Sequence, residues 1–76
     1  MTSVKIRLST INDVKEFVNA VTLCDYEVDL VSGRYAIDAK SIMGIFSLDL
    51  SRPVDVVIHT DECGGFLNQI DKFLVK

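Results

Sequence analysis

The stretch that decides the fold is residues 38–48, which read Asp38-Ala39-Lys40-Ser41-Ile42-Met43-Gly44-Ile45-Phe46-Ser47-Leu48. This pattern predicts the end of a strand followed by a short helix over residues 42–48. Ser41 is placed to cap that helix, because a serine hydroxyl can accept one of the backbone N–H groups that a first helical turn leaves unpaired. Strand and helix therefore meet at Ser41, and the elements on either side can be placed outward from it.

The short helix is predicted to have a buried and an exposed apolar side. Ile45 and Leu48 lie three residues apart and can both face a core, which turns Met43 and Phe46 outward next to Ile42. Exposed large apolar side chains on a two-turn helix predict a docking patch for a protein partner, and methionine adapts well to varied partners. The alternative, that all of these side chains belong to the core, stays open.

Alternation of apolar and polar residues predicts four strands around this helix. One strand lies near the N-terminus, two form a hairpin with a turn at Ser32-Gly33, and one follows the chain-breaking Pro53. The four strands are expected over residues 4–8, 26–30, 35–38 and 54–58.

Two further amphipathic helices are predicted from apolar residues spaced at i, i+3 and i+4. They are expected over residues 14–21 and 66–74. Asn12 or Asp13 is expected to cap the first of them, and Thr60 or Asp61 the second, since these side chains accept N–H groups of a first turn. The order strand, helix, strand, strand, helix, strand, helix predicts an α+β fold with one sheet covered on one face by three helices.

The composition narrows the possible functions. The chain has 76 residues, which suits a single domain over residues 1–76, and its net charge is −3 with no basic stripe, which excludes nucleic acid as an expected partner. No run approaches the roughly 18 apolar residues of a membrane span, and the N-terminus lacks the apolar centre of a signal peptide, so a cytoplasmic protein is expected. Cys24 and Cys63 have no metal-ligand spacing and are expected to be reduced thiols.

Residues 28–48 and the strand after Pro53 resemble HPr, the histidine-containing phosphocarrier of the bacterial sugar phosphotransferase system. The resemblance rests on the string Lys-Ser-Ile-Met-Gly at residues 40–44, on the hairpin before it, and on the element order βαββαβα, which matches that family over essentially the whole chain. It implies an open-faced β-sandwich whose four-stranded antiparallel sheet has the order 1-4-2-3. This order sets the fourth strand, with Asp55 and His59, between a basic strand containing Lys5 and an acidic strand containing Asp29, so opposite charges lie across neighbouring strands.

The sequence departs from the family at its active-site loop. HPr carries its phosphate on a histidine in a Gly-Leu-His-Ala-Arg-Pro loop between the first strand and the first helix, where backbone N–H groups and an arginine stabilise the phosphoryl group. Residues 9–16 take that place here and contain no histidine, arginine, glycine or proline. The single histidine, His59, falls in the fourth strand and is expected to face solvent without metal-binding partners. We therefore expect no catalytic residue, no metal, no cofactor and no phosphorylation on histidine.

Ser41 then becomes the main candidate site. In HPr of Gram-positive type the matching serine is phosphorylated by HPr kinase/phosphorylase, and the phosphorylated form binds a transcription factor of carbon catabolite repression. The resemblance therefore implies regulatory phosphorylation at Ser41 and partner binding through Lys40, Ile42, Met43 and Phe46. The chain is predicted to be a non-catalytic regulatory or adaptor protein of sugar transport, and not an enzyme.

One alternative stays open for the function. The chain can be a degenerate HPr fold that is kept only as a structural or oligomerisation module, in which Ser41 is no more than a helix cap. In that case the exposed patch is the interface of a homodimer and not a docking site for a regulator.

Overall fold

The sheet has four antiparallel strands in the order β1-β4-β2-β3. The computed structural model describes residues 1–75. The two inner strands are β4 (Val54–Ile58) and β2 (Val28–Ser32), and the two edge strands are β1 (Thr2–Ile6) and β3 (Tyr35–Asp38). The predicted strand order is confirmed, and each strand lies within two residues of its predicted position.

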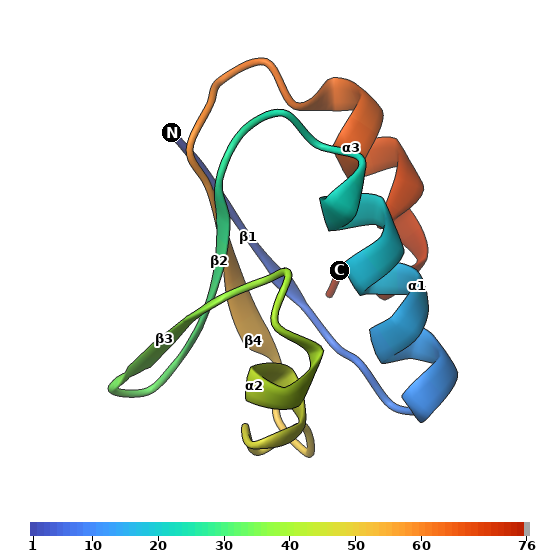
Figure 1. Cartoon of the computed structure of the whole chain (residues 1–76), viewed down its shortest axis with the longest axis vertical. Coiled ribbons are helices and arrows are strands. Elements are labelled where there is room, and N and C mark those ends of the chain that lie inside the picture. The colour runs from blue at the N-terminus through green and yellow to red at the C-terminus, as the bar shows by residue number, and fades with distance from the viewer. Residues whose placement is uncertain (76) are drawn as a thin grey trace.

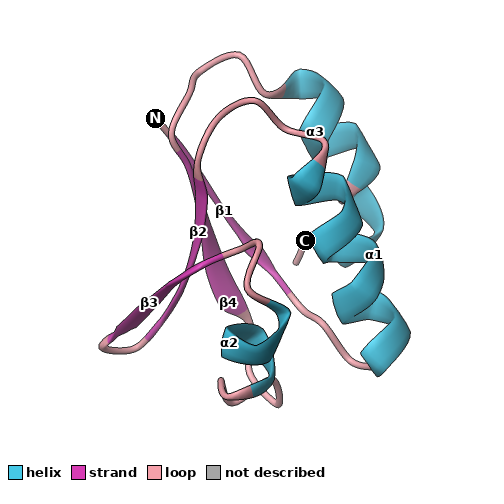
Figure 2. Cartoon of the chain, viewed as in Figure 1, coloured by secondary structure: helices cyan, strands magenta, loops and turns pink. Residues whose placement is uncertain are grey.

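All the helices lie on one face of this sheet, and the other face is open (Figures 1 and 2). They are α1 (Ile11–Thr22), α2 (Ile42–Phe46), α3 (Gly64–Gln69) and a final 3-10 turn, η1 (Asp71–Phe73). The α+β open-faced sandwich predicted from the sequence is therefore confirmed. No helix within residues 1–75 is long and apolar enough to cross a bilayer.

The core lies between the sheet and the helices. Every second residue of β4 is buried, since Val54, Val56 and Ile58 are at most 1% exposed and face the helices. The aromatic rings of Phe17 in α1 and Phe66 in α3 join these helices, with ring centroids 6.3 Å apart. The largest fully buried side chains include Phe17, Ile6, Leu8, Leu30, Ile45, Ile58 and Ile70.

The first helix begins earlier than predicted. Its N-cap is Thr10, and neither Asn12 nor Asp13 has that position. Thr10 Oγ1 accepts from the Asp13 backbone N–H at 3.1 Å, and Asp13 Oδ2 accepts from the Thr10 N–H at 3.3 Å. The prediction was wrong because this reciprocal capping box satisfies two N–H groups at once, whereas a single cap at residue 12 or 13 satisfies one.

The last helix begins at Gly64, and its cap position is Cys63, which makes no side-chain capping bond. The prediction that Thr60 or Asp61 caps this helix is wrong, because both side chains bind other groups. The Thr60 hydroxyl accepts from the Glu62 N–H at 3.1 Å, and the Asp61 carboxylate pairs with the N-terminal ammonium group. Beyond η1 the chain returns along β1, where the Val75 N–H donates to the Lys5 carbonyl at 2.9 Å.

The open face of the sheet carries the charges that were expected to lie across strands. Lys5 stands directly opposite Asp55, with 3.9 Å between Lys5 Nζ and Asp55 Oδ1. His59 is an exposed residue of this face, and its Nε2 lies 2.8 Å from Asp29 Oδ2. The predicted solvent-facing position of His59 is confirmed, and its partner is a single carboxylate. No group of three or more potential metal ligands occurs among residues 1–75.

Both cysteines are free thiols near the half-buried Tyr26. The Tyr26 ring meets the Phe66 ring edge-on, with centroids 6.4 Å apart. Burial of the phenol, together with its hydrogen bond to the Cys24 side chain, raises the pKa of Tyr26 from 10.0 to about 12. The neutral phenol is thus part of the packing between the loop before β2 and α3.

This packing predicts a specific loss of stability at high pH. The unfolded chain ionises its tyrosines near pH 10, before the folded chain ionises Tyr26, so stability falls as the pH rises from about 10 towards about 12. We expect Tyr26 to account for roughly 1–2 kcal/mol of that loss, measured as urea unfolding free energy against pH. Tyr26→Phe should flatten the curve, and the matched Tyr35→Phe should not; equal curves for Tyr26→Phe and the wild type contradict the assignment.

Candidate functional site

Ser41 lies between β3 and α2 in an exposed turn. Its Oγ accepts from the Gly44 N–H at 3.2 Å, which confirms the predicted capping role. The turn is held from the strand side by Asp38, whose carbonyl accepts from the Ser41 N–H and whose Oδ1 accepts from the Lys40 N–H, both at 2.9 Å. Backbone and side-chain bonds therefore fix the residues around Ser41 while its side chain stays at the surface.

Gly44 controls how closely α2 approaches this turn. A Cβ atom at residue 44 would lie 3.1 Å from Ser41 Oγ and 3.3 Å from Ile37 Cδ1, closer than side-chain carbons normally come. Glycine costs about 1 kcal/mol in a helix relative to alanine, so its place inside a short helix has a packing reason. This role of Gly44 was not predicted from the sequence. The available signal was a glycine three residues after a capping serine.

The apolar side chains of α2 differ in exposure, and α2 ends at Phe46, two residues before the predicted end of the helix at residue 48. Met43 is 76% exposed and Phe46 is 42% exposed, whereas Ile45 is fully buried. Ile42, expected to be exposed, is half-buried, because its side chain packs against the hydrophobic core. The exposed part of the patch on α2 therefore consists of Met43 and Phe46, with Ile42 at its inner border.

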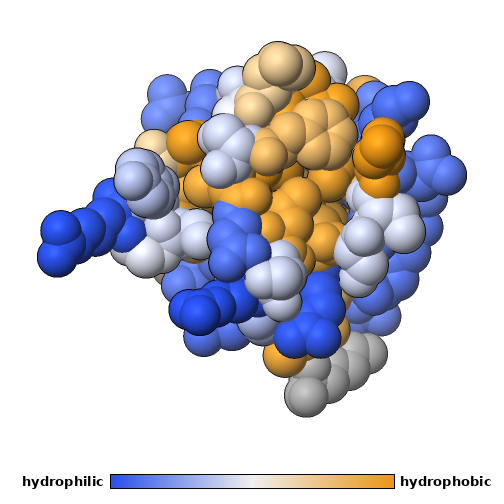
Figure 3. All heavy atoms as spheres, turned by 90° about the horizontal axis from the view of Figure 1, so that it is seen from below, coloured by the Kyte–Doolittle hydropathy of each residue, from blue (hydrophilic) through white to orange (hydrophobic). Residues whose placement is uncertain are grey.

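The end of the molecule that contains α2 has an apolar centre. Figure 3, which shows that end from below, has hydrophobic atoms gathered in the middle of the face and hydrophilic residues around them. Lys40, the residue before Ser41, is exposed, and its side chain forms no ion pair with any residue from 1 to 75. The structure thus brings the five predicted site residues together in one segment, with Ser41 and Lys40 beside the apolar side chains.

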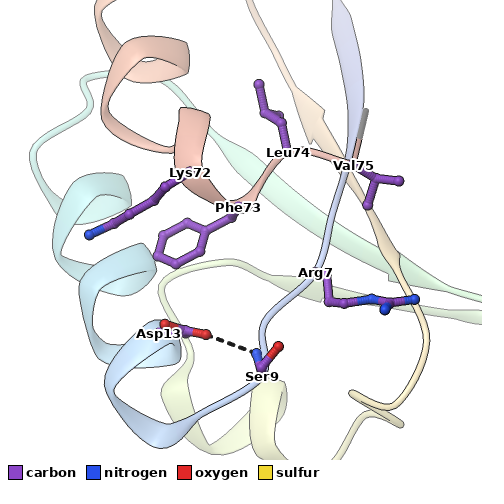
Figure 4. Close-up of a pocket in the computed structure, with 7 residues that line it drawn as sticks. All are labelled: Arg7, Ser9, Asp13, Lys72, Phe73, Leu74 and Val75. Carbon is purple, nitrogen blue, oxygen red and sulfur yellow. Dashed lines mark hydrogen bonds between the residues drawn. The ribbon is translucent and has the colours of Figure 1, made fainter.

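The loop between β1 and α1 is closed by its own carboxylate. Asp13 Oδ2 accepts from the Ser9 N–H at 3.0 Å as well as from the Thr10 N–H, so both donors have an internal partner (Figure 4). The loop borders a hollow of about 480 Å³ that is also lined by Arg7, Lys72 and the chain end. An anion that entered there would meet the negative charge of Asp13 and would have to displace it from both N–H groups.

The basic side chains that line this hollow, Arg7 and Lys72, do not point towards the loop between β1 and α1. Lys72 pairs with Glu16 of α1, and its Nζ lies 5.4 Å from the centroid of the Phe73 ring. Arg7 extends away from Asp13 and from Lys72 in Figure 4. His59 lies at the other end of the sheet, since Ile58 pairs with Thr2 and the loop begins beyond Ile6. The structure therefore brings no histidine to the loop.

Comparisons with known proteins give a match among solved structures alone. No protein-family model matches the sequence, and a search of curated proteins finds no match. Among solved structures the chain is similar to that reported as "Crystal structure of HPr-C-His from Thermoanaerobacter tengcongensis", with 22% sequence identity and a TM-score of 0.77 over 95% of this chain and 89% of that chain. At this identity the likeness shows a common architecture, and the chain has the HPr-like fold.

Proposed function

We propose that this chain is a non-catalytic, HPr-like regulatory or adaptor protein of the bacterial cytoplasm, which binds a protein partner through the patch on α2. The observation that carries the proposal is the contrast between the two helix starts. The start of α1 has no histidine and is closed by Asp13, whereas the start of α2 has an exposed serine next to exposed apolar side chains. The resemblance to HPr supplies the kind of partner.

The start of α1 argues against phosphotransfer in the HPr manner. A phosphocarrier needs a nucleophile there and free N–H groups to hold the phosphoryl oxygens. Here the nucleophile is missing, and the N–H groups of Ser9 and Thr10 already donate to Asp13. An acyl phosphate on Asp13 lacks support, because such chemistry relies on a metal and acidic neighbours.

The segment around Ser41 suits a modification switch. A phosphate on Ser41 adds about −1.5 to −2 charges at the start of the helix that carries Met43 and Phe46, which changes what the patch can bind without any change of fold. Lys40 adjoins the site and has no acidic partner within residues 1–75, so it is available to the added charge. The proposed modifying enzyme is HPr kinase/phosphorylase, and the proposed reader is a transcription factor of catabolite repression.

The first prediction concerns histidine-type phosphorylation. Incubation with a PEP-driven phosphotransfer mixture should leave the chain unmodified, because no imidazole lies at the start of α1. The measurement is intact-mass spectrometry after acid and after base treatment, with an authentic HPr in the same mixture as the positive control. A phosphate that is acid-labile and base-stable on this chain would contradict the proposal.

The second prediction concerns Ser41. Treatment with HPr kinase and ATP should add one phosphate to the wild type and none to Ser41→Ala. Ser47→Ala is the matched control, since Ser47 is an exposed serine at the other end of α2 and its variant should still be modified. Loss of the cap should cost Ser41→Ala about 1 kcal/mol, so its folding is checked by thermal unfolding. No mass gain on the wild type, or an equal gain on Ser41→Ala, rules out the switch.

The third prediction concerns the patch. Phe46→Glu should weaken binding of the Ser41-phosphorylated chain to the catabolite-repression transcription factor at least tenfold, because it places a charge in a desolvated contact. Leu23→Glu is the control, since Leu23 is 77% exposed and lies at the far end of α1. Affinity is measured by calorimetric titration, with circular dichroism to confirm folding. Equal affinities for the two variants would remove α2 from the interface.

A further inference from the structure

The two edge strands of the sheet differ in whether another segment pairs with their outer side. The β1 edge is partly covered, because the chain end returns along it and Leu74 forms a bridge to Ile6. The β3 edge is open: among residues 1–75 only β2 pairs with β3, and Figure 1 shows no element beyond it. An open edge carries unpaired N–H and C=O groups and is a template for a further strand.

The hairpin fixes which backbone groups of β3 point outward. The loop of the hairpin is Gly33-Arg34, with Gly33 at φ 60, so Ser32 and Tyr35 are the pair that closes it. The two residues of such a closing pair exchange backbone hydrogen bonds. Along the hairpin, hydrogen-bonded pairs then alternate with pairs that are not hydrogen-bonded. The Ala39 N–H donates to the Val28 carbonyl at 2.9 Å, as expected if residues 28 and 39 form a hydrogen-bonded pair in this alternation. The backbone groups of residues 35, 37 and 39 therefore face β2, and those of residues 36 and 38 face outward, while Arg34 belongs to the turn that precedes β3.

The sequence of this edge is complementary to itself in one antiparallel register. With Ala36 of one copy opposite Ala36 of a second copy, the outward backbone groups of the two Ala36 residues meet. Arg34, the turn residue before β3, then comes level with Asp38 of the other copy at both ends of the pair. Registers centred on residue 34 or on residue 38 place like charges opposite each other. The register that sets Ala36 against Asp38 brings Arg34 against Lys40. Of the registers compared, the one centred on Ala36 sets opposite charges level with each other at both ends of the pair.

The side chains of the remaining positions suit the same register. Tyr35, which is 71% exposed, stands opposite the half-buried Ile37 of the second copy in a pair without hydrogen bonds, where side chains are closest. Within residues 1–75 Arg34 forms no ion pair, and Asp38 uses only Oδ1, for the Lys40 N–H. Both charges of the edge are therefore available to a second copy.

We infer that two copies of this chain associate antiparallel through β3, with Arg34 of each copy paired to Asp38 of the other. The resulting sheet has eight strands, twice the four of one chain, and is continuous across a two-fold axis. The contact uses only the 4 residues of β3 and the adjacent turn residue Arg34 on each copy, so the dimer exchanges rapidly with monomer at a weak affinity. This inference does not rest on the proposed function, because it uses the edge of β3 and not the exposed side of α2.

The first test is sedimentation equilibrium of the wild type up to about 1 mM, the weak end of specific association. A monomer–dimer equilibrium is expected. Ala36→Pro should weaken it at least tenfold, because the Ala36 N–H points outward and proline is tolerated at such an edge position in the monomer. Phe46→Glu should leave it unchanged. A monomeric wild type, or association that survives Ala36→Pro and is lost in Phe46→Glu, overturns the inference.

The second test mixes two charge variants. In Arg34→Glu both cross-edge contacts set two carboxylates against each other, and in Asp38→Lys both contacts set two cations against each other. Each variant alone should therefore associate at least tenfold more weakly than the wild type. An equimolar mixture should recover a dimer near wild-type affinity, because the mixed pair has two attractive contacts. Arg7→Glu, at the opposite edge, has the same charge change as Arg34→Glu and should associate like the wild type.

Both variants are checked for folding by their amide NMR spectra, since Asp38→Lys removes the acceptor for the Lys40 N–H. If the two folded variants do not associate when they are mixed, the proposed register centred on Ala36 is wrong. Equal weakening by Arg7→Glu assigns the effect to net charge and also overturns it.

Discussion

The pairing of β4 with both β1 and β2 is the interaction on which the rest of the fold depends. β4 is the third-last element of the chain, yet it lies in the middle of the sheet and joins the N-terminal strand to the central hairpin. Its alternate residues Val54, Val56 and Ile58 form the floor on which the helices pack. Such non-local pairing costs loop-closure entropy, which the burial of these apolar side chains offsets.

The position of α2 follows from this floor and from one small residue. Ile45 is fully buried, which draws the short helix onto the end of the sheet, and Gly44 lets it approach Ile37 and the Ser41 hydroxyl closely. A helix of five residues has little stability of its own. Its exposed residues Met43 and Phe46 are therefore presented by the packing of their neighbours and not by the intrinsic stability of the helix.

Sequence patterns were sufficient to predict the strands and the cap at Ser41, because alternation and a serine before an apolar run are local signals. The strand order was predicted through the resemblance to HPr. They failed where several residues compete for one role. Around α1, three cap-forming residues lie close together, and the choice of Thr10 depends on its reciprocal bonds with Asp13. Before α3, Asp61 pairs with the chain's N-terminus, a partner that is distant in sequence. The half-buried state of Ile42 likewise depends on the distance between α2 and the sheet, which no local pattern contains.

Asp13 also decides how the start of α1 differs from the start of α2. By accepting from Ser9 and Thr10, its carboxylate is held in the first turn of α1, where a negative charge complements the helix dipole. At α2 the acceptor is a neutral hydroxyl on an exposed serine, and no acidic side chain lies in the first turn. The same architecture thus has one helix start with a carboxylate in its first turn and one whose cap is an exposed, neutral hydroxyl. That difference comes from Asp13 within α1 and from Ser41 before α2, and both helices pack on the same sheet.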